Sequence, residues 1–292
     1  MSISTTFAFF GTGPLAESVL ASLVRHGFTP TLIVTKPDSQ SGRHLVKSTP
    51  HIKVWAEMKN IPVYQPETLK ELPEDSPLLS QKFSFFVVAS YGKILPEKVL
   101  DLAPLGTLNV HPSGLPLYRG PSPIESALLD GVGTIGISIM KLDNEVDHGP
   151  ILVQTVITVE KRDTALTIEI KAGLEGGALL SQCLPHFLER TLLPKEQDHS
   201  MATFCKKIEK EMGEVNLDDS STSLFHKYQA FTPWPGIYFF HTHNEKKIRV
   251  KISEINFDFA KEDTVKNIIL KVIPEGKKEM SFEDFKRGYH ML

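Results

Sequence analysis

Cysteine is scarce in this sequence. Its two cysteines, Cys183 and Cys205, are too few to form the disulfide framework of a small secreted protein. No apolar run approaches the roughly 20 residues that a membrane-spanning helix needs, and the first residues lack the basic segment that opens a secretion signal. These deficits favour a soluble protein of the reducing cytoplasm.

Positive charge is not in excess either. The 32 Lys and Arg residues face 35 Asp and Glu residues, which leaves a formal net charge of -3. Such a balance excludes a general attraction to nucleic acid or to an anionic membrane. A nucleic-acid partner would therefore have to bind local basic patches.

Two such basic patches are present. Residues 37–53 form a long polar loop that carries Arg43, Lys47 and Lys53 against the single acid Asp38. Residues 246–251, with the sequence KKIRVK, place four cations on one expected strand. The loop needs no partner if it is merely a surface loop, but its composition also suits a segment that orders against a phosphate backbone.

The first two thirds of the chain alternate between β-branched apolar runs and helical patterns. The expected strands are residues 7–10, 31–35, 83–90, 106–111, 135–141 and 151–159. The expected helices are residues 16–27, 51–60, 121–131 and 163–190. This alternation predicts an α/β fold with a doubly wound, mostly parallel, Rossmann-like sheet.

The character of the sequence changes after residue 190. Residues 191–205 are polar, are interrupted by Pro194 and show no sustained period, so we interpret them as a linker. Alternating segments and an aromatic turn follow. We therefore predict a Rossmann-like domain over residues 1–190 and a C-terminal β-barrel (OB-like) domain over residues 206–292.

The stretch TLNVHPSGLP, residues 107–116, places Asn109 and His111 two positions apart at the end of an expected strand. Residues i and i+2 of a strand point to the same face, so an amide and an imidazole would stand side by side. Taken alone, this pattern more often marks a buried structural histidine beside a turn. A functional interpretation needs a second motif.

The segment KLDNEVDHGPILVQ, residues 141–154, supplies candidate partners for that histidine. Its carboxylates are Asp143, Glu145 and Asp147, and a Gly-Pro pair follows before an apolar strand. A carboxylate beside His111 would orient the imidazole and favour its charged form. A solvated surface cluster is the alternative, and the sequence alone does not show that the two loops meet.

Two other patterns carry weaker signals. Gly11, Gly13 and Ala16 match a dinucleotide-binding fingerprint, which leaves a nicotinamide dehydrogenase as an alternative. Pro14, however, removes one amide donor from that turn, so a tight turn without phosphate is favoured. His241 and His243 have no third ligand at a suitable spacing, and we expect no metal.

Taken together, these motifs resemble the folate-dependent formyltransferases. LNVHPSGLPLYRGPSPI resembles the active-site segment of that family, and DHGPILVQ resembles its downstream aspartate segment. The resemblance extends from Phe7 to Gly288 and is strongest to members that act on initiator methionyl-tRNA. The family usually has Leu where Gly114 stands, which affects the expected shape of the folate pocket.

The resemblance implies roles for particular residues. Asn109, His111 and Asp147 match the catalytic trio, and residues 89–96 and 139–147 would flank the pterin. The folate-binding segment would be Ser113, Gly114, Leu115 and Pro116. Arg43 and Lys47 match a tRNA-facing insertion. The implied co-substrate is 10-formyltetrahydrofolate, without a metal.

The implied reaction transfers the formyl group to the α-amine of initiator methionyl-tRNA. A sugar-nucleotide amine is the main alternative acceptor, and glycinamide ribonucleotide is a weaker one because its enzymes generally lack the basic insertion and the second domain. A non-catalytic tRNA-binding module is a further alternative, but it would not need the trio. We expect a monomer in the cytoplasm, serving a bacterial or organellar translation system.

Overall fold

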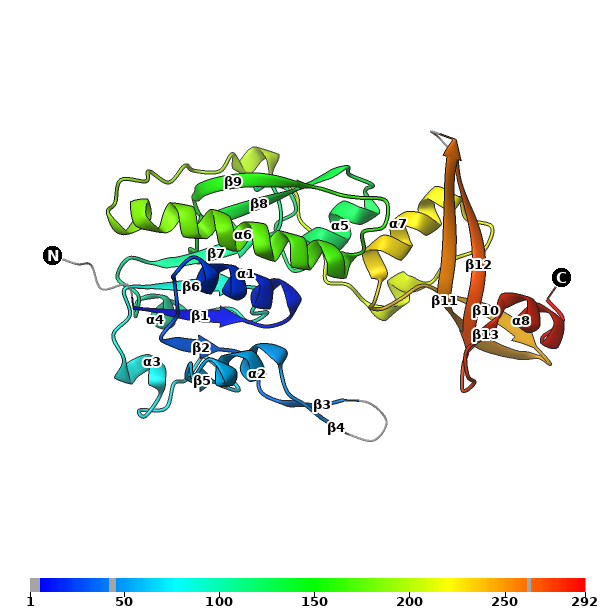
Figure 1. Ribbon diagram of the computed structural model, residues 1–292, viewed down its shortest axis with the longest axis horizontal. Helices are drawn as coiled ribbons and strands as arrows, with labels where there is room; N and C mark the ends of the chain where they lie inside the picture. Colours follow the sequence, from blue (N-terminus) through cyan, green and yellow to red (C-terminus); the bar gives the residue numbers. More distant parts are fainter. Residues whose placement is uncertain (1–5, 42–45, 262–263, 292) are drawn as a thin grey trace. The chain divides into compact units, whose positions relative to one another are not determined.

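The computed structural model describes residues 6–41, 46–261 and 264–291, and the chain forms two compact units (Figure 1). The first unit comprises residues 1–123, 134–158 and 168–205, and the second comprises residues 124–133, 159–167 and 206–292. Two short segments from earlier in the sequence thus belong to the C-terminal unit. Within the described residues, no helix is long and apolar enough to cross a membrane.

The first unit is built on a seven-stranded sheet in the order β5-β2-β1-β6-β7-β8-β9. Its strands are β1 (Phe7–Gly11), β2 (Leu32–Val34), β5 (Val63–Tyr64), β6 (Phe85–Ala89), β7 (Thr107–His111), β8 (Thr134–Lys141) and β9 (Ile151–Thr158). The pairs from β5 to β7 are parallel, whereas β8 and β9 pair antiparallel. The predicted mostly parallel, doubly wound sheet is confirmed.

Helices cover both faces of this sheet. They are α1 (Pro14–Arg25), α2 (His51–Met58), α3 (Pro77–Ser80), α4 (Glu97–Leu100) and the long α6 (Ala165–Leu188). The helix α6 packs closely on one face, where Gly176 meets Val110 of β7 and Ile137 of β8. Small residues let the helix backbone approach the sheet, which fixes the orientation of β7.

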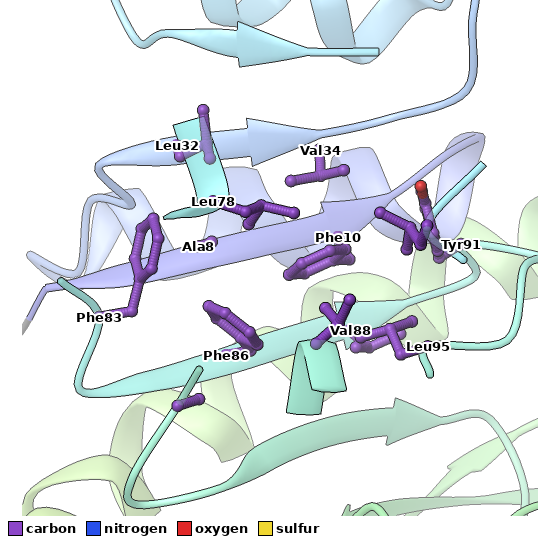
Figure 2. Close-up of a cluster of buried hydrophobic side chains, with 13 residues drawn as sticks. Ala8, Phe10, Leu32, Val34, Leu78, Phe83, Phe86, Val88, Tyr91 and Leu95 are labelled. Atoms are coloured by element: carbon purple, nitrogen blue, oxygen red, sulfur yellow. The ribbon is translucent and has the colours of Figure 1, made fainter. Parts of the chain in front are cut away.

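The opposite face carries a cluster of buried hydrophobic side chains (Figure 2). Ala8 and Phe10 of β1 pack there with Phe86 of β6 and with Leu78 of α3. Side chains alternate between the two faces along β1 and β6, so the neighbouring Phe7 and Phe85 lie on the α6 side of the sheet. Their rings stack with centroids 5.0 Å apart, and Phe85 also contacts Phe187 of α6. The cluster extends to the carboxyl ends of the strands, next to the loops of the candidate site.

The turn from β1 to α1 is tight. A Cβ atom on Gly11 would lie 2.7 Å from the Cβ of Ala16, and Gly13 adopts a φ of 86°. Pro14 occupies the first helical turn, where its missing N–H breaks no helical hydrogen bond. These glycines therefore have a packing explanation that needs no dinucleotide.

The basic segment after β2 contains a short hairpin where we expected an irregular loop. Strands β3 (Ser39–Ser41) and β4 (Val46–Ser48) pair antiparallel, with Gln40 opposite Lys47. Lys53 forms an ion pair with Asp38 at 3.2 Å. Arg43 lies outside the described residues. The polar strand residues have weak β propensity, which is why the sequence pattern did not reveal the hairpin.

The second unit contains the predicted small β-rich fold. Its strands, β10 (Tyr238–His243), β11 (Lys246–Lys261), β12 (Thr264–Pro274) and β13 (Met280–Ser281), form an antiparallel sheet in sequence order. Its helices are α5 (Pro123–Leu129), α7 (Ser221–Phe231), α8 (Phe282–Gly288) and the 3-10 turn η2 (Lys210–Gly213). His241 and His243, considered above as a metal pair, both contact the backbone carbonyl of Tyr289.

The segment predicted as a linker packs onto the first unit. Lys195 pairs with Ile151 of β9, Phe204 pairs with Arg119, and the 3-10 turn η1 (His199–Met201) lies between these bridges. Backbone hydrogen bonds form these bridges, so no hydrophobic period in the sequence predicts them. The domain limits at residues 190 and 206 remain a prediction from the sequence.

Candidate active site

Strand β7 delivers Asn109 and His111 to one face of the sheet. Val110, between them, packs against Gly176 of α6, so its two neighbours face away from that helix. Asn109 lies opposite Val88 of β6 and Met140 of β8. Both polar side chains are buried, and the predicted side-by-side placement is present.

Asp147 meets these two side chains from the loop between β8 and β9. Its Oδ1 lies 3.4 Å from Asn109 Nδ2 and 3.6 Å from His111 Nδ1. Its Oδ2 accepts a hydrogen bond of 2.8 Å from the backbone N–H of Gly120. One carboxylate oxygen is thus fixed by the backbone, while the other faces two side-chain donors at long distances.

The ring of His111 faces an acceptor on each side. Nε2 lies 3.0 Å from the backbone carbonyl of Tyr118, and Nδ1 faces the carboxylate of Asp147. A doubly protonated imidazole satisfies both acceptors, whereas either neutral tautomer leaves one ring nitrogen without a proton to donate. The ring is therefore held between a backbone carbonyl and a carboxylate.

The expected folate-binding segment is fixed by hydrogen bonds from β8 and β9. Ser113 Oγ donates to the carbonyl of Leu117, and the carbonyl of Ser113 accepts from Ser138 Oγ, each at 2.6 Å. The backbone N–H of Leu115 donates to the same hydroxyl, and its carbonyl accepts from Gln154. Sequence reasoning missed Ser138 and Gln154 because each looks like an ordinary polar residue of an alternating strand.

Gly114 and Pro116 complete this segment. A Cβ atom on Gly114 would lie 3.7 Å from the Cα of Gly136, which is an ordinary contact. Gly114 therefore has room for a side chain, and the family's usual Leu would not clash at its Cβ. The close approach requires glycine at Gly136 instead, where a Cβ would lie 2.3 Å from the backbone nitrogen of Gly114.

The two loops expected to flank the pterin, residues 89–96 and 139–147, both pack on the buried cluster of Figure 2. Tyr91 and Leu95 are buried there. Leu142 packs against the same cluster. Burial raises the pKa of Tyr91 to about 12, with a smaller contribution from Tyr64. These loops also carry exposed apolar side chains, among them that of Ile94.

Two buried residues behind the trio were also missed. Arg119 and Gln197 hydrogen-bond each other, and Gln197 donates to the backbone carbonyl of Asp147. Arg119 stands three residues after Pro116, directly behind the catalytic motif, which is a signal that could have been used. Gln197 lies in the segment interpreted as a linker and gives no such signal.

The other candidate residues do not join the trio. Asp143 pairs with His148 at 2.7 Å, while Glu145 is exposed. Lys47 lies on β4, and its side chain, like all of Arg43, lies outside the described part of the structure. Within that part, no three His, Cys, Asp or Glu side chains gather as a metal site would require.

The second unit has a basic and aromatic face on its sheet. Alternate residues of β11, from Lys247 to Lys251, are exposed cations on one side of the strand. Lys247 Nζ lies 4.1 Å from the ring centroid of Phe240, and the guanidinium of Arg249 lies 5.3 Å from that of Tyr238. Exposed cations held over aromatic rings can contact both phosphates and bases.

Comparison with known proteins gives matches to both parts of the chain. The family model for formyl transferase matches residues 5–184, and the model for formyl transferase, C-terminal domain, matches residues 207–268. The chain is 40% identical over 233 residues to the methionyl-tRNA formyltransferase of Campylobacter curvus, covering 79% of this chain and 75% of that protein. It is 32% identical over 300 residues to the methionyl-tRNA formyltransferase of Bacillus licheniformis, covering 97% and 95%.

A solved structure shows the same fold. The N-formyltransferase from Helicobacter canadensis, in complex with folinic acid and dTDP-3-aminofucose, matches with a TM-score of 0.62 at 16% identity. The match covers 94% of this chain and 98% of that chain. At this level of identity the likeness concerns the architecture, whereas the family models and the closer relatives carry the assignment.

Proposed function

The chain belongs to the methionyl-tRNA formyltransferase family, and we propose that it transfers the formyl group of 10-formyltetrahydrofolate to the α-amine of initiator methionyl-tRNA. The observation that carries the proposed mechanism is the convergence of Asn109 Nδ2 and His111 Nδ1 on one oxygen of Asp147. Two donors and one acceptor meeting at a single point are the groups that acyl transfer to an amine requires.

Each member of the trio has a distinct task in this mechanism. Asn109 and the ring of His111 donate hydrogen bonds to the formyl oxygen as negative charge develops on it. Asp147 keeps the imidazole oriented and accepts the proton that the attacking amine loses, directly or through a water. The bond from the formyl carbon to the amine forms, the bond to the folate nitrogen breaks, and that nitrogen receives a proton.

The residues around the trio suit a folate. When bound, 10-formyltetrahydrofolate supplies the formyl carbon that is transferred. Ile94 and Val146, on the two loops that flank the trio, are 84% and 59% exposed and offer apolar contacts to a flat ring system. Ser138 and Gln154 hold the backbone of Ser113 to Pro116 in a fixed shape beside them.

Contact with tRNA is assigned to the two basic patches. In the second unit these are Lys247, Arg249 and Lys251 on β11, the first two over aromatic rings. In the first unit they are Lys47 on β4 and, from the sequence, Arg43. Such exposed cations neutralise phosphates without reading sequence. We further propose a monomer that acts in the cytoplasm and serves a bacterial or organellar translation system.

A sugar-nucleotide amine remains the alternative acceptor, because a sugar N-formyltransferase shares the fold. Membership of the family removes the dehydrogenase and the non-catalytic module. The deciding experiment offers 10-formyltetrahydrofolate with initiator methionyl-tRNA, elongator methionyl-tRNA or a dTDP-amino sugar, and follows the formylated product. Rapid formylation of the initiator species supports the proposal, and formylation of the sugar amine alone overturns it.

A further inference from the structure

The side-chain amide of Gln197 uses its full hydrogen-bonding capacity. Its Oε1 accepts two hydrogen bonds from Arg119, from Nη2 at 2.7 Å and from Nε at 3.2 Å. Its Nε2 donates to the backbone carbonyls of Asp147 at 2.9 Å and Gly149 at 2.7 Å. Two donors and two acceptors leave the amide a single satisfied orientation.

Arg119 is the anchor on the other side of this amide. It is 3% exposed, and its charge has no carboxylate partner among the described residues. Its Nη2 also donates to His199 Nδ1 at 2.9 Å, and its backbone is bound on both sides by the segment that contains Thr203 and Cys205. A buried guanidinium without hydrogen bonds would cost several kcal/mol, so these acceptors fix its place.

A second contact links residues 197–205 to the loop that carries Asp147. The ring of His199 stacks on the ring of His148 with centroids 4.0 Å apart and an interplanar angle of 4°. His148 in turn pairs with Asp143 at the start of that loop. Asp198 begins the turn η1 by accepting hydrogen bonds from Ser200, which sets the direction of the neighbouring His199.

We propose that Gln197, held by Arg119, is a positioning residue for Asp147. Asp147 has a φ of 48°, a strained region for a residue with a side chain, so its loop needs support from outside. The amide of Gln197 captures the carbonyls on both sides of His148 and thereby fixes the backbone that presents the Asp147 carboxylate. This inference rests on the function proposed above and extends it to the segment that connects the two units.

The test replaces the amide by an isosteric carboxylate. Gln197→Glu keeps acceptors for Arg119 but loses the donor to the Asp147 and Gly149 carbonyls. With both substrates saturating, we expect the single-turnover rate of formyl transfer to fall between about tenfold and a hundredfold, because small displacements of a catalytic group have effects of that size. The KM values for folate and tRNA should change by less than about threefold.

Gln229→Glu is the matched control. Gln229 is also buried, and its Nε2 donates to the backbone carbonyls of Glu160 and Asp163 in the second unit. The Gln229→Glu variant loses the same kind of hydrogen bond and leaves the trio unchanged. The proposal is supported if only Gln197→Glu slows the chemical step, and it is overturned if the two variants lose rate equally at matched folded fractions.

A double-mutant cycle separates positioning from a direct role. If Gln197 acts through Asp147, Gln197→Glu should reduce the rate of wild-type protein but add nothing in an Asp147→Ala background. Multiplicative losses overturn the proposal. If Gln197→Glu does not fold, Arg119→Lys takes its place in the same cycle. Absence of formyl transfer by the wild-type protein would instead refute the proposed function.

Discussion

The two units use their charged and polar side chains in opposite ways. In the first unit Asn109, His111 and Arg119 are buried, and their polar atoms face fixed partners within the fold. In the second unit Lys247 and Arg249 are exposed on one face of the sheet and lie over aromatic rings.

The difference separates chemistry from recognition. A buried hydrogen-bonding network holds its geometry and is little affected by salt, which suits the stabilisation of charge in a transition state. Exposed cations on flexible stems adapt to a polyanion and are screened by salt. Substitutions in the first unit should therefore change the rate of the chemical step, and substitutions on the β11 face should change tRNA affinity.

The largest effect is expected from the trio. His111→Ala and Asn109→Ala should each reduce the single-turnover rate by roughly a hundredfold or more, because each removes a donor to the developing oxyanion. The loss should be the same at low and high salt. Rapid-quench measurement of formyl transfer, with circular dichroism to confirm the fold, checks both. Near-normal activity in either folded variant would remove it from the catalytic site.

A smaller effect, and of a different kind, is expected from the β11 face. The double variant Lys247→Gln/Arg249→Gln should raise the KM for methionyl-tRNA on the order of tenfold and leave the saturated rate unchanged. The log–log salt slope should become shallower by about two units, because each of the two cations neutralises one phosphate. Titrations at several salt concentrations measure both quantities. An unchanged slope would show that these cations do not bind phosphates.

The hairpin segment sharpens the comparison because it belongs to the first unit but is expected to behave like the β11 face. Arg43→Ala should weaken methionyl-tRNA use several-fold, with a salt slope shallower by about one unit, and should barely change the folate KM. Measuring the KM of each substrate separates an effect on tRNA binding from an effect on folate binding. Equal damage to folate use would assign this segment to the folate site and favour the sugar acceptor.

The smallest effect concerns Cys183 in α6. Burial raises the pKa of its thiol to about 12, so the folded protein holds the proton that the unfolded chain loses above about pH 9. The stability gained is complete below that pH and is lost as the pH rises toward 12, by about 1 kcal/mol per pH unit. Urea unfolding of wild type and Cys183→Ala at pH 8 and 10 tests this. Parallel pH dependence in the two proteins would contradict it.

The sequence predicted the parts of the site that lie on one strand and in one motif. Asn109 and His111 share a face because β7 is extended, and its length and apolar neighbours were visible in the pattern. Asp147 was then predicted from the resemblance of its segment to the aspartate segment of the family. The mostly parallel sheet followed from the alternation of apolar runs with helical patterns, which local propensity controls.

The supporting residues could not be predicted in the same way. Gln197 reaches the Asp147 loop across 48 to 50 residues of sequence, and its role depends on the folding of a segment without a hydrophobic period. Ser138 and Gln154 act on Leu115 through tertiary hydrogen bonds. Such interactions are properties of the folded chain, and they cannot be predicted from the identity of a single residue.

The division between the units is tested most directly by the rate of the first turnover of formyl transfer. This rate is measured at saturating folate over a range of methionyl-tRNA concentrations. Wild type, His111→Ala and Lys247→Gln/Arg249→Gln are compared. We predict that the double variant reaches the wild-type rate at high tRNA, while His111→Ala stays slow at every concentration. The account is contradicted if the double variant remains slow at saturating tRNA, or if excess tRNA restores the rate of His111→Ala.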